Sequence, residues 1–356
     1  MKCAPLGTLC QIAMTSPALD QLLSVTIPHD RIATSPAHPR ESARLLLLRR
    51  ATGELTDLTI RDLPSLLSPT DLLVLNNSKV IPARLICSQN RTELLLLEET
   101  SPGWWTALGT PSKRLQPGTT VFPDPIPEST PVGPAPQLRV EKSIPGGQLV
   151  LRVLGDSLNL EHYGLPPLPP YILKSRKVQG QPDFQPSDLT DYQTTYAQPP
   201  GSVAAPTAGL HFTPELLAHF SHTFVTLHVG LGTFRPIKTE DFRDHPMHSE
   251  HYEIPTGFAE KAAAADKLIA VGTTSARVLE SAPSLTPHQG TTSAFIYPPY
   301  EFKRVGGLLT NFHLAHSTLL LLVAAFAGPD LTLRAYRHAL ENKYRFFSFG
   351  DAMLIL

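Results

Sequence analysis

The stretch that most limits the possible folds is Arg84 to Val153, because its pattern consists only of short strands and turns. Glycine and proline separate its apolar runs, which are Leu94–Leu97, Trp104–Leu108, Thr119–Phe122, Gln137–Val140 and Leu149–Val153. Short strands at such near-regular spacing are typical of a small antiparallel barrel. The sequence on both sides alternates strand and helix patterns. It therefore predicts an α/β fold: a mixed α/β main domain with an inserted small antiparallel β-barrel domain.

The length of the chain supports two domains, because 356 residues exceed what one hydrophobic core usually supports. We assign residues 1–24 to an N-terminal extension and residues 76–160 to the inserted barrel. Residues 25–75 and 161–356 then form one discontinuous α/β domain. The proline run Pro166–Pro170 is predicted to be a rigid return connector. We expect no strand pairing between the inserted sheet and the main sheet.

Charge and cysteine content limit the classes of function. The 30 Lys and Arg residues nearly cancel the 31 Asp and Glu residues, so any nucleic-acid contact must come from a local basic face. Cys3, Cys10 and Cys87 form neither a metal pattern nor a disulfide framework, which fits a reducing cytosol. We find no convincing signal peptide, and apolar runs such as Thr318–Ala327 are too short to span a bilayer. We expect a cytoplasmic, soluble monomer with no membrane partner.

The main domain should contain several buried strands and amphipathic helices. The expected strands are Leu45–Leu48, Asp71–Leu75, Phe224–Val229, Leu268–Val271, Phe295–Tyr297, Leu308–Leu309 and Ala352–Leu356. The expected helices begin at Thr213-Pro214 and span Phe258–Lys267, Ala276–Ser281, Thr318–Ala327 and Thr332–Lys343. We interpret Gly290–Ser293 as a polar loop.

Two glycine-containing loops flank one helix and one strand between Gly201 and Arg235. Before Thr213 and after Val229, glycines stand beside hydroxyls and imidazoles: Thr207, Gly209 and His211 in the first loop, and His228, Gly230, Gly232 and Thr233 in the second. Glycine lets backbone amides approach a ligand closely, although an ordinary turn is the favoured interpretation of each glycine taken alone. Two such loops around one helix and strand favour a shared pocket.

Polar residues also follow other predicted strands. Asn76-Asn77-Ser78-Lys79 ends one apolar run, and an asparagine pair there marks either a site or a simple turn. Gly272 to Ser275 ends another strand at a helix start, which suits an anion or a carboxylate. Asn311-Phe312-His313 ends a third.

Histidines offer proton carriers or metal ligands. His245, His248 and Glu250 could hold a divalent metal if their loop curled around it, but their spacing is not the helical pair of a zinc peptidase. Acid–base and hydrogen-bonding roles are favoured there, and we predict no metal. His211, His228 and His313 each end or follow a strand or lie in a loop, where one of them could carry a proton; a structural role is the alternative.

Several blocks resemble the S-adenosylmethionine:tRNA ribosyltransferase-isomerase family of queuosine biosynthesis. They are Leu72–Arg84, Ala204–Thr213, Val225–Pro236, His245–Glu250, Ala270–Ser275, Leu309–Leu314 and Tyr344–Met353. The likeness runs from about Ile27 to Leu356. The chain departs from the family pattern at Lys79, where arginine is usual, and at Glu41, Ala315 and Gly306-Gly307.

The resemblance implies an α/β domain with an inserted barrel and a transferase activity. The ribosyl part of S-adenosylmethionine would be transferred and isomerised onto 7-aminomethyl-7-deazaguanine at the tRNA wobble position, giving epoxyqueuosine-tRNA, adenine and methionine. S-adenosylmethionine is then a substrate, and no cofactor is implied. The reaction requires a positioned base that removes a proton next to the sulfonium, which favours a histidine or a partly buried carboxylate.

We assign candidate residues to three roles. Catalytic candidates are His211, His228, His248, Glu250 and His313, with Asp351 as a further carboxylate. S-adenosylmethionine-binding candidates are Thr207, Gly209, Phe212, Gly230, Gly232, Thr233, Thr273, Thr274, Ser275, Arg277, Asn311 and Phe312, with adenine stacking on Phe212, Phe234 or Phe312. Candidates for tRNA binding are Asn76, Asn77, Lys79, Arg84, Lys113, Arg114, Arg235 and Arg345.

Two alternatives belong to other classes. One is a non-catalytic RNA-binding protein, in which the barrel grips tRNA and the α/β domain is structural. The other is a metal-dependent hydrolase that uses His245, His248 and Glu250. Release of adenine from S-adenosylmethionine separates the three in one assay.

Overall fold

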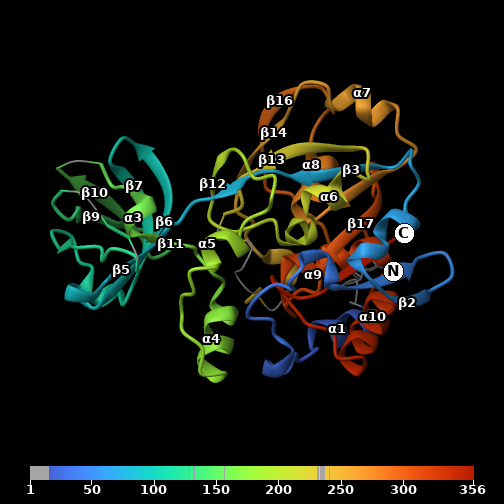
Figure 1. Cartoon of the computed structure of the whole chain (residues 1–356), viewed down its shortest axis with the longest axis horizontal. Helices are drawn as coiled ribbons and strands as arrows, with labels where there is room; N and C mark the ends of the chain where they lie inside the picture. Colours follow the sequence, from blue (N-terminus) through green and yellow to red (C-terminus); the bar gives the residue numbers. More distant parts are fainter. Residues whose placement is uncertain are drawn as a thin grey trace, which may run out of the picture.

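The computed structural model describes residues 16–356 apart from 128, 131–132, 156, 231, 233–236 and 240. Its helices are α1 Pro17–Leu23, α2 Leu63–Leu66, α3 Leu160–Tyr163, α4 Pro170–Val178, α5 Asp188–Asp191, α6 Pro214–Leu217, α7 Phe258–Ala263, α8 Thr273–Ser281, α9 Thr318–Ala327 and α10 Pro329–Glu341. Two large sheets, one at each end of the molecule, are joined by a narrow neck (Figure 1).

The main sheet is mixed. Its strands are β1 Arg44–Arg49, β2 Glu54–Thr59, β3 Leu72–Asn76, β13 His222–Leu227, β14 Glu250–Ile254, β15 Leu268–Val271, β16 His288–Thr292, β17 Val305–Asn311 and β18 Ala352–Ile355, in the order β16-β14-β13-β3-β15-β17-β18-β1-β2. The central four, β13, β3, β15 and β17, are parallel. Their carboxyl ends therefore meet at one edge, where polar side chains from distant parts of the sequence converge.

Both faces of this sheet are covered, as its continuous apolar strands require. Successive side chains of β3 alternate between two cores, with Leu72 and Val74 in one and Leu73 and Leu75 in the other. Helices α1, α8, α9 and α10 supply the larger core, whereas α2 and α6 supply the smaller one. This burial on both faces explains why the strands read as apolar runs.

The inserted unit is a curled antiparallel sheet (Figure 1, left). Its strands are β5 Arg84–Cys87, β6 Thr92–Ser101, β7 Trp104–Thr110, β8 Thr120–Val121, β9 Gln137–Ile144, β10 Gln148–Leu154 and β11 Gly164–Leu165, in the order β11-β5-β6-β7-β10-β9-β8. In the described residues its edge strands β11 and β8 do not pair, so a closed barrel is not shown. Among the described residues, no strand of the inserted sheet pairs with a strand of the main sheet, as predicted.

The neck between the sheets is a short parallel pair, β4 Lys79–Val80 with β12 Pro200–Ser202. The chain leaves the main sheet at the carboxyl end of β3 and returns through β12. Because the inserted sheet is attached at that edge, it stands over the carboxyl ends of the central strands (Figure 1).

Several predicted boundaries are wrong. Phe295–Tyr297 is not a strand, and Gly290–Ser293 is not a loop, because Gly290 to Thr292 pair with β14 as part of β16. The part of the N-terminal extension that the structure describes forms α1, whose Leu19 and Leu22 are buried against the main core. Pro170, predicted to end a connector, begins α4, because proline is well suited to the first turn of a helix.

Helix caps agree with the sequence. The Thr213 side chain accepts a hydrogen bond from the Leu216 amide at the start of α6, and Ser317 does the same for Leu320 in α9. Gly328, with φ of 89°, ends α9. Within the described part of the chain, no single helix has the length and apolar character to span a bilayer. Helices α9 and α10 meet these two criteria only when they are counted together, and the chain bends by 112° between them.

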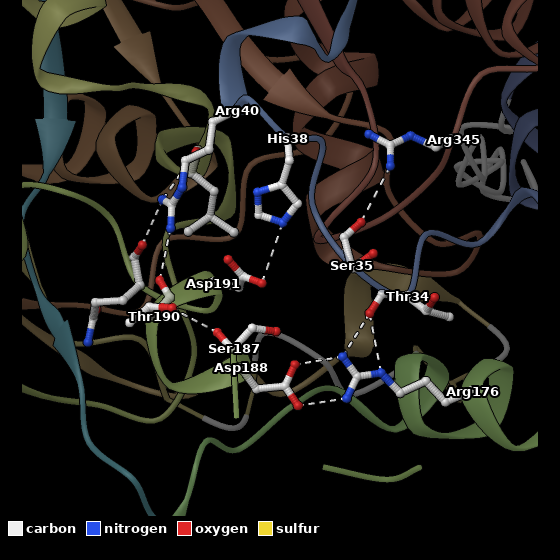
Figure 2. Close-up of polar contacts among 12 residues, drawn as sticks. Thr34, Ser35, His38, Arg40, Arg176, Ser187, Asp188, Thr190, Asp191 and Arg345 are labelled. Carbon is white, nitrogen blue, oxygen red and sulfur yellow. Dashed lines mark hydrogen bonds and ion pairs between the residues drawn. The ribbon is translucent and has the colours of Figure 1, made fainter. Parts of the chain in front are cut away.

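A buried ion pair fastens the returning chain to the N-terminal segment. Figure 2 shows Arg176 of α4 making two contacts to Asp188 of α5, at 2.6 and 2.7 Å, and also donating to the Thr34 carbonyl. Neither side chain of the pair is more than 2% exposed. Nearby, Arg40 donates to the Thr190 carbonyl (Figure 2). A bidentate guanidinium–carboxylate pair fixes both distance and orientation.

We predict that Asp188→Ala lowers the free energy of unfolding by about 3–5 kcal/mol, because it leaves the Arg176 charge buried without its partner. The matched control is Asp241→Ala, which removes the exposed partner of Arg243 and should change stability little. Urea unfolding of both variants measures the difference. Equal, small losses in the two variants would show that the buried pair does not fasten this region.

Candidate active site

A cavity of about 520 Å³ lies between the two sheets. Ile81, Leu97, Glu98, Glu99, Trp105 and Gln148 line it from the neck and the inserted sheet. The neck strand β12 adds Pro200 and Gly201, and the main domain contributes Val203, His228, Val229, Gly230, Gly232 and His248 to His251. Five residues singled out from the sequence thus meet here: His228, Gly230, Gly232, His248 and Glu250. Three imidazoles and three carboxylates around one space can exchange protons and hold a cationic group.

His228 follows directly after β13 and is half-buried. Its backbone amide donates to the His251 carbonyl, which extends the pairing of β13 with β14. Leu227 and Val229 point into the main core, so His228 points to the other side, as the predicted alternation requires. Burial, and secondarily the neighbouring His251, lowers the pKa of His228 below its ordinary value, against a raising effect of Glu253. The imidazole is therefore neutral at pH 7 and able to accept a proton.

A buried polar relay sets the position of His228. Asn76, at the end of β3, accepts from the Leu227 amide at 3.0 Å and donates to the Leu227 carbonyl at 2.9 Å. Its oxygen also accepts from the Ser78 amide. Ser202 of the neck donates to the Ser78 hydroxyl and accepts from the Val229 amide. The backbone on both sides of His228 is thus fixed by side chains from β3 and the neck.

Glu250 is held on both carboxylate oxygens. One accepts from the Gly230 amide at 2.9 Å, and the other forms a buried ion pair with Arg277 of α8. Arg277 also donates to the Ala294 carbonyl. These contacts engage both carboxylate oxygens of Glu250 and fix the glycine loop, which suits a positioning role better than proton transfer. Arg277 is correspondingly a partner of Glu250 and does not line the cavities described here.

Two further cavities adjoin each other at the carboxyl ends of β15 and β17. A small one of about 40 Å³ is lined by Thr207, Gly272, Thr273, Thr274, Asn311 and His313, among others. A larger one of about 420 Å³ shares Thr207, Asn311 and His313 with it and adds Phe312, Tyr171 and Phe347. Val229 borders both the small cavity and the one between the sheets. The predicted substrate-binding residues therefore fall into two neighbouring groups.

His211 and His313 differ from His228 in their surroundings. His211 is 6% exposed, and burial, with the positive charges of Arg345 and Arg40, lowers its pKa to about 3. Its Nε2 lies 3.4 Å from the Asn311 amide nitrogen. Burial also lowers the pKa of His313 to about 3. Both rings are neutral at pH 7 and hold a proton poorly, which makes them weaker candidates for a general base than His228.

Several other candidates for S-adenosylmethionine binding are engaged in packing or in hydrogen bonds within the protein. Phe212 is fully buried in the smaller core, so it offers no face for stacking, and Phe312 packs against Phe346 while bordering the 420 Å³ cavity. A Cβ on Gly209 would lie 2.0 Å from the Tyr196 hydroxyl, so this glycine is required for packing. The Ser275 hydroxyl donates to the Val271 carbonyl. Thr233, Phe234 and Arg235 lie outside the described residues.

The candidates for tRNA binding fall into an exposed group and a buried group. Lys79 of the neck and Lys113 and Arg114 of the inserted sheet are exposed, and Asn77 is partly exposed. Asn76 is buried in the relay, and Arg84 is buried in an ion pair with Glu93, so neither presents its polar group to a surface ligand. Arg345 is partly exposed and lies 3.6 Å from Asp351.

The metal-binding alternative lacks a suitable donor set. Among the residues that the structure describes, no group of three or more His, Cys, Asp or Glu side chains is placed to hold a metal ion. Glu250, which that alternative needs as a ligand, is engaged by Arg277 and Gly230. The arrangement thus gives the metal-dependent hydrolase no support, and independence from metal stays a prediction.

Sequence reasoning missed the contribution of the inserted sheet to the cavity. Glu98, Glu99, Trp105 and Gln148 carry no local motif, because only the folding of one sheet over the other brings them to the main domain. Gly201 was also missed as a site residue. A Cβ on it would lie 2.8 Å from His228 Nδ1, so the neck passes His228 closely only because residue 201 is glycine.

We predict that Gly201→Ala displaces the His228 ring and raises the pKa of His228 towards 6.5, because the displaced ring is less buried. Gly257→Ala is a matched control: Gly257 also has a positive φ, of 79°, but nothing lies near its Cβ position. NMR titration of the histidines measures the effect. An unchanged His228 pKa in the Gly201 variant would contradict the proposed contact.

We predict that His211 makes folding stability depend on pH. The folded state takes up this proton only near pH 3, whereas the unfolded chain takes it up near 6.5, so stability is complete above 6.5 and falls with pH below it. Between pH 7 and 5 the loss should be about 2 kcal/mol larger in the wild type than in His211→Gln. Urea unfolding at both pH values checks this. Identical losses would show that His211 is protonated in the folded protein.

Known proteins resemble the chain over most of its length. Residues 22–355 match the sequence model of a family described as queuosine biosynthesis protein. The S-adenosylmethionine:tRNA ribosyltransferase-isomerase of Halothermothrix orenii is 44% identical, over 93% of this chain and 97% of that protein. The enzyme of the same name from Thermus thermophilus is 46% identical, with the same coverage.

A solved structure is also similar. The crystal structure of S-adenosylmethionine tRNA ribosyltransferase from Thermotoga maritima is 35% identical, with a TM-score of 0.51, and the match covers 93% of this chain and 99% of that one. The family match over nearly the whole chain, together with relatives of this identity and coverage, shows that the chain belongs to the queuosine biosynthesis protein family of S-adenosylmethionine:tRNA ribosyltransferase-isomerases.

Proposed function

We propose that this protein transfers and isomerises the ribosyl group of S-adenosylmethionine onto 7-aminomethyl-7-deazaguanine at the wobble position of tRNA. The products would be epoxyqueuosine-tRNA, adenine and methionine. The observation that carries the proposal is the cavity between the sheets, in which His228 and carboxylates from both units surround a space of about 520 Å³. Family membership supplies the identity of the two substrates.

The charge of the cavity fits these substrates. Both the sulfonium of S-adenosylmethionine and a protonated aminomethyl group are cations. Glu98, Glu99 and Glu250 line the cavity, and among its described lining residues none is lysine or arginine. A cationic group entering it gains favourable charge interactions with Glu98 and Glu99, whereas the charge of Glu250 is already paired with Arg277. The base of the wobble nucleotide must leave the anticodon stack to enter such a cavity.

The chemistry needs a base near the sulfonium. The positive sulfur acidifies the protons on the neighbouring ribose carbon, so a neutral imidazole can remove one, and adenine then leaves the sugar. The amine of the deazaguanine attacks the resulting sugar, and methionine departs with the sulfur. His228 is the base that we favour, because its lowered pKa keeps it neutral and its ring borders the cavity. His248 is the second candidate in the same cavity, and Glu250 is assigned to positioning.

We assign tRNA binding to exposed cations of both units. Lys79 lies on the neck, and Lys113 and Arg114 lie on the inserted sheet, where they can contact phosphates on either side of the cavity. The inserted unit would act as a small barrel-like module that grips the RNA. We also propose that the protein acts in the cytoplasm as a monomer, with S-adenosylmethionine as a substrate and no cofactor.

The direct test measures adenine release from S-adenosylmethionine with tRNA that carries the aminomethyl base. We expect release to require this tRNA and to survive exhaustive chelation. His228→Ala should lower turnover by roughly 10²-fold, the usual contribution of a general base, without unfolding the protein. His222→Ala is a matched control, since His222 begins the same strand and lines none of the cavities described above. Near-normal turnover of His228→Ala at saturating substrates would exclude His228 as the base.

A non-catalytic RNA-binding protein is excluded if adenine is released at all. Conversely, tight tRNA binding without adenine release would contradict the proposed transfer.

A further inference from the structure

We propose that the start of α8 and the Thr274 hydroxyl form a site for the α-carboxylate of S-adenosylmethionine, inside the 40 Å³ cavity. This inference rests on the proposed function, because that function supplies the ligand. It assigns one group of the ligand to one part of the protein. Arg277, the cation nearest in sequence, has no part in it, because it is paired with Glu250.

The first turn of α8 offers backbone donors. A helix leaves its first amides without carbonyl partners, here those of Thr273, Thr274 and Ser275. Gly272, the N-cap residue, has no side chain with which to satisfy them. The helix dipole adds a partial positive charge at the same end. Amides in this state favour an anion, provided that something else brings it there.

The Thr274 hydroxyl is the independent indication of a ligand. Thr274 is 7% exposed and lines the small cavity, and its Oγ1 is buried without a hydrogen-bond partner among the described residues. A buried hydroxyl without a partner costs free energy, so its retention at a cavity wall indicates an acceptor that binds there. A carboxylate oxygen is such an acceptor.

The size and polarity of the cavity select a carboxylate over a larger anion. A cavity needs roughly 10–15 Å³ to hold one water molecule, so about 40 Å³ accommodates about three heavy atoms, the number in a carboxylate group. None of the described lining residues is Asp or Glu. The Thr207 hydroxyl is already used, because it donates to Asn311 Oδ1 at 2.7 Å, and the Thr310 hydroxyl lies 2.7 Å from His313 Nε2. The Thr274 hydroxyl, in contrast, is buried at the cavity without a partner among the described residues.

The position of the cavity agrees with the reaction. It shares Thr207, Asn311, His313 and Leu319 with the 420 Å³ cavity, and Val229 with the cavity between the sheets. A ligand anchored here by its carboxylate can extend into either neighbouring space. Gly272 also has a role. Its φ of 89° lets the chain turn from β15 into α8, and a Cβ at this position would lie 3.6 Å from the Thr274 hydroxyl oxygen.

The test compares the binding of S-adenosylmethionine with that of its decarboxylated analogue, which lacks only the carboxylate. Calorimetric titrations are made with tRNA that has guanine at the wobble position, because this tRNA cannot accept the ribosyl group. The wild type should prefer S-adenosylmethionine by tenfold or more. Thr274→Val should reduce that preference by roughly tenfold, the usual effect of one hydrogen bond to a charged group, and leave the affinity for the analogue unchanged.

Two variants serve as controls. Thr274→Ser keeps the hydroxyl and should restore the preference. Ser281→Ala removes a hydroxyl from the other end of α8, where it donates to the Arg277 carbonyl, and should have no effect. Unchanged affinity of Thr274→Val for the analogue also shows that the variant is folded.

The outcomes separate this inference from the proposed function. A wild type that binds S-adenosylmethionine without preference over the analogue, or a Thr274→Val variant with the full preference, overturns the carboxylate site alone. A wild type that binds neither compound overturns the proposed function as well.

Discussion

The arrangement of the site depends on one buried amide side chain, that of Asn76. It ends β3 and makes both an accepting and a donating hydrogen bond to the backbone of Leu227, so it continues the pairing of β3 with β13 beyond the last strand residue. Through Ser78 it also connects to Ser202 in the neck, which in turn binds the Val229 amide. A buried polar network of this kind favours one geometry, because each group that lost its partner would be costly. His228 stands between the two backbone positions that the network holds.

The neck explains how two sheets without shared pairing make one site. The chain leaves the main sheet where the central parallel strands end, so the inserted sheet stands over the edge at which polar residues gather. The strand β12 returns beside β4 and passes close to His228 at Gly201. Earlier on the returning chain, the Arg176–Asp188 pair fastens α4 and α5 to the segment around Thr34 (Figure 2). The cavity is thus a product of chain topology, lined by histidines of the main domain and by carboxylates of the inserted sheet.

Local patterns predicted the parts of the fold that depend on local chemistry. The caps Thr213 and Ser317, the helix stop at Gly328 and the apolar strand β15 follow from residue type and spacing alone. The strand β16 was not predicted, because His288 to Thr292 is polar and pairs with β14 only through the tertiary fold. The candidate site likewise combines residues that local patterns indicate with residues that only tertiary contacts bring in. The glycine and histidine blocks indicated His228 and Glu250, whereas the burial of Asn76 and Arg84 and the contribution of Glu98 and Trp105 depend on contacts between distant segments.

The central claim, that Asn76 acts on the reaction by positioning His228, is tested most directly by a double-mutant cycle. Adenine release is measured for Asn76→Ala, His228→Ala and the double variant, all at saturating substrates. If Asn76 works through His228, each single variant is impaired and the double variant is no slower than His228→Ala alone. Losses that multiply in the double variant would contradict the account, because they would show that the two residues contribute independently.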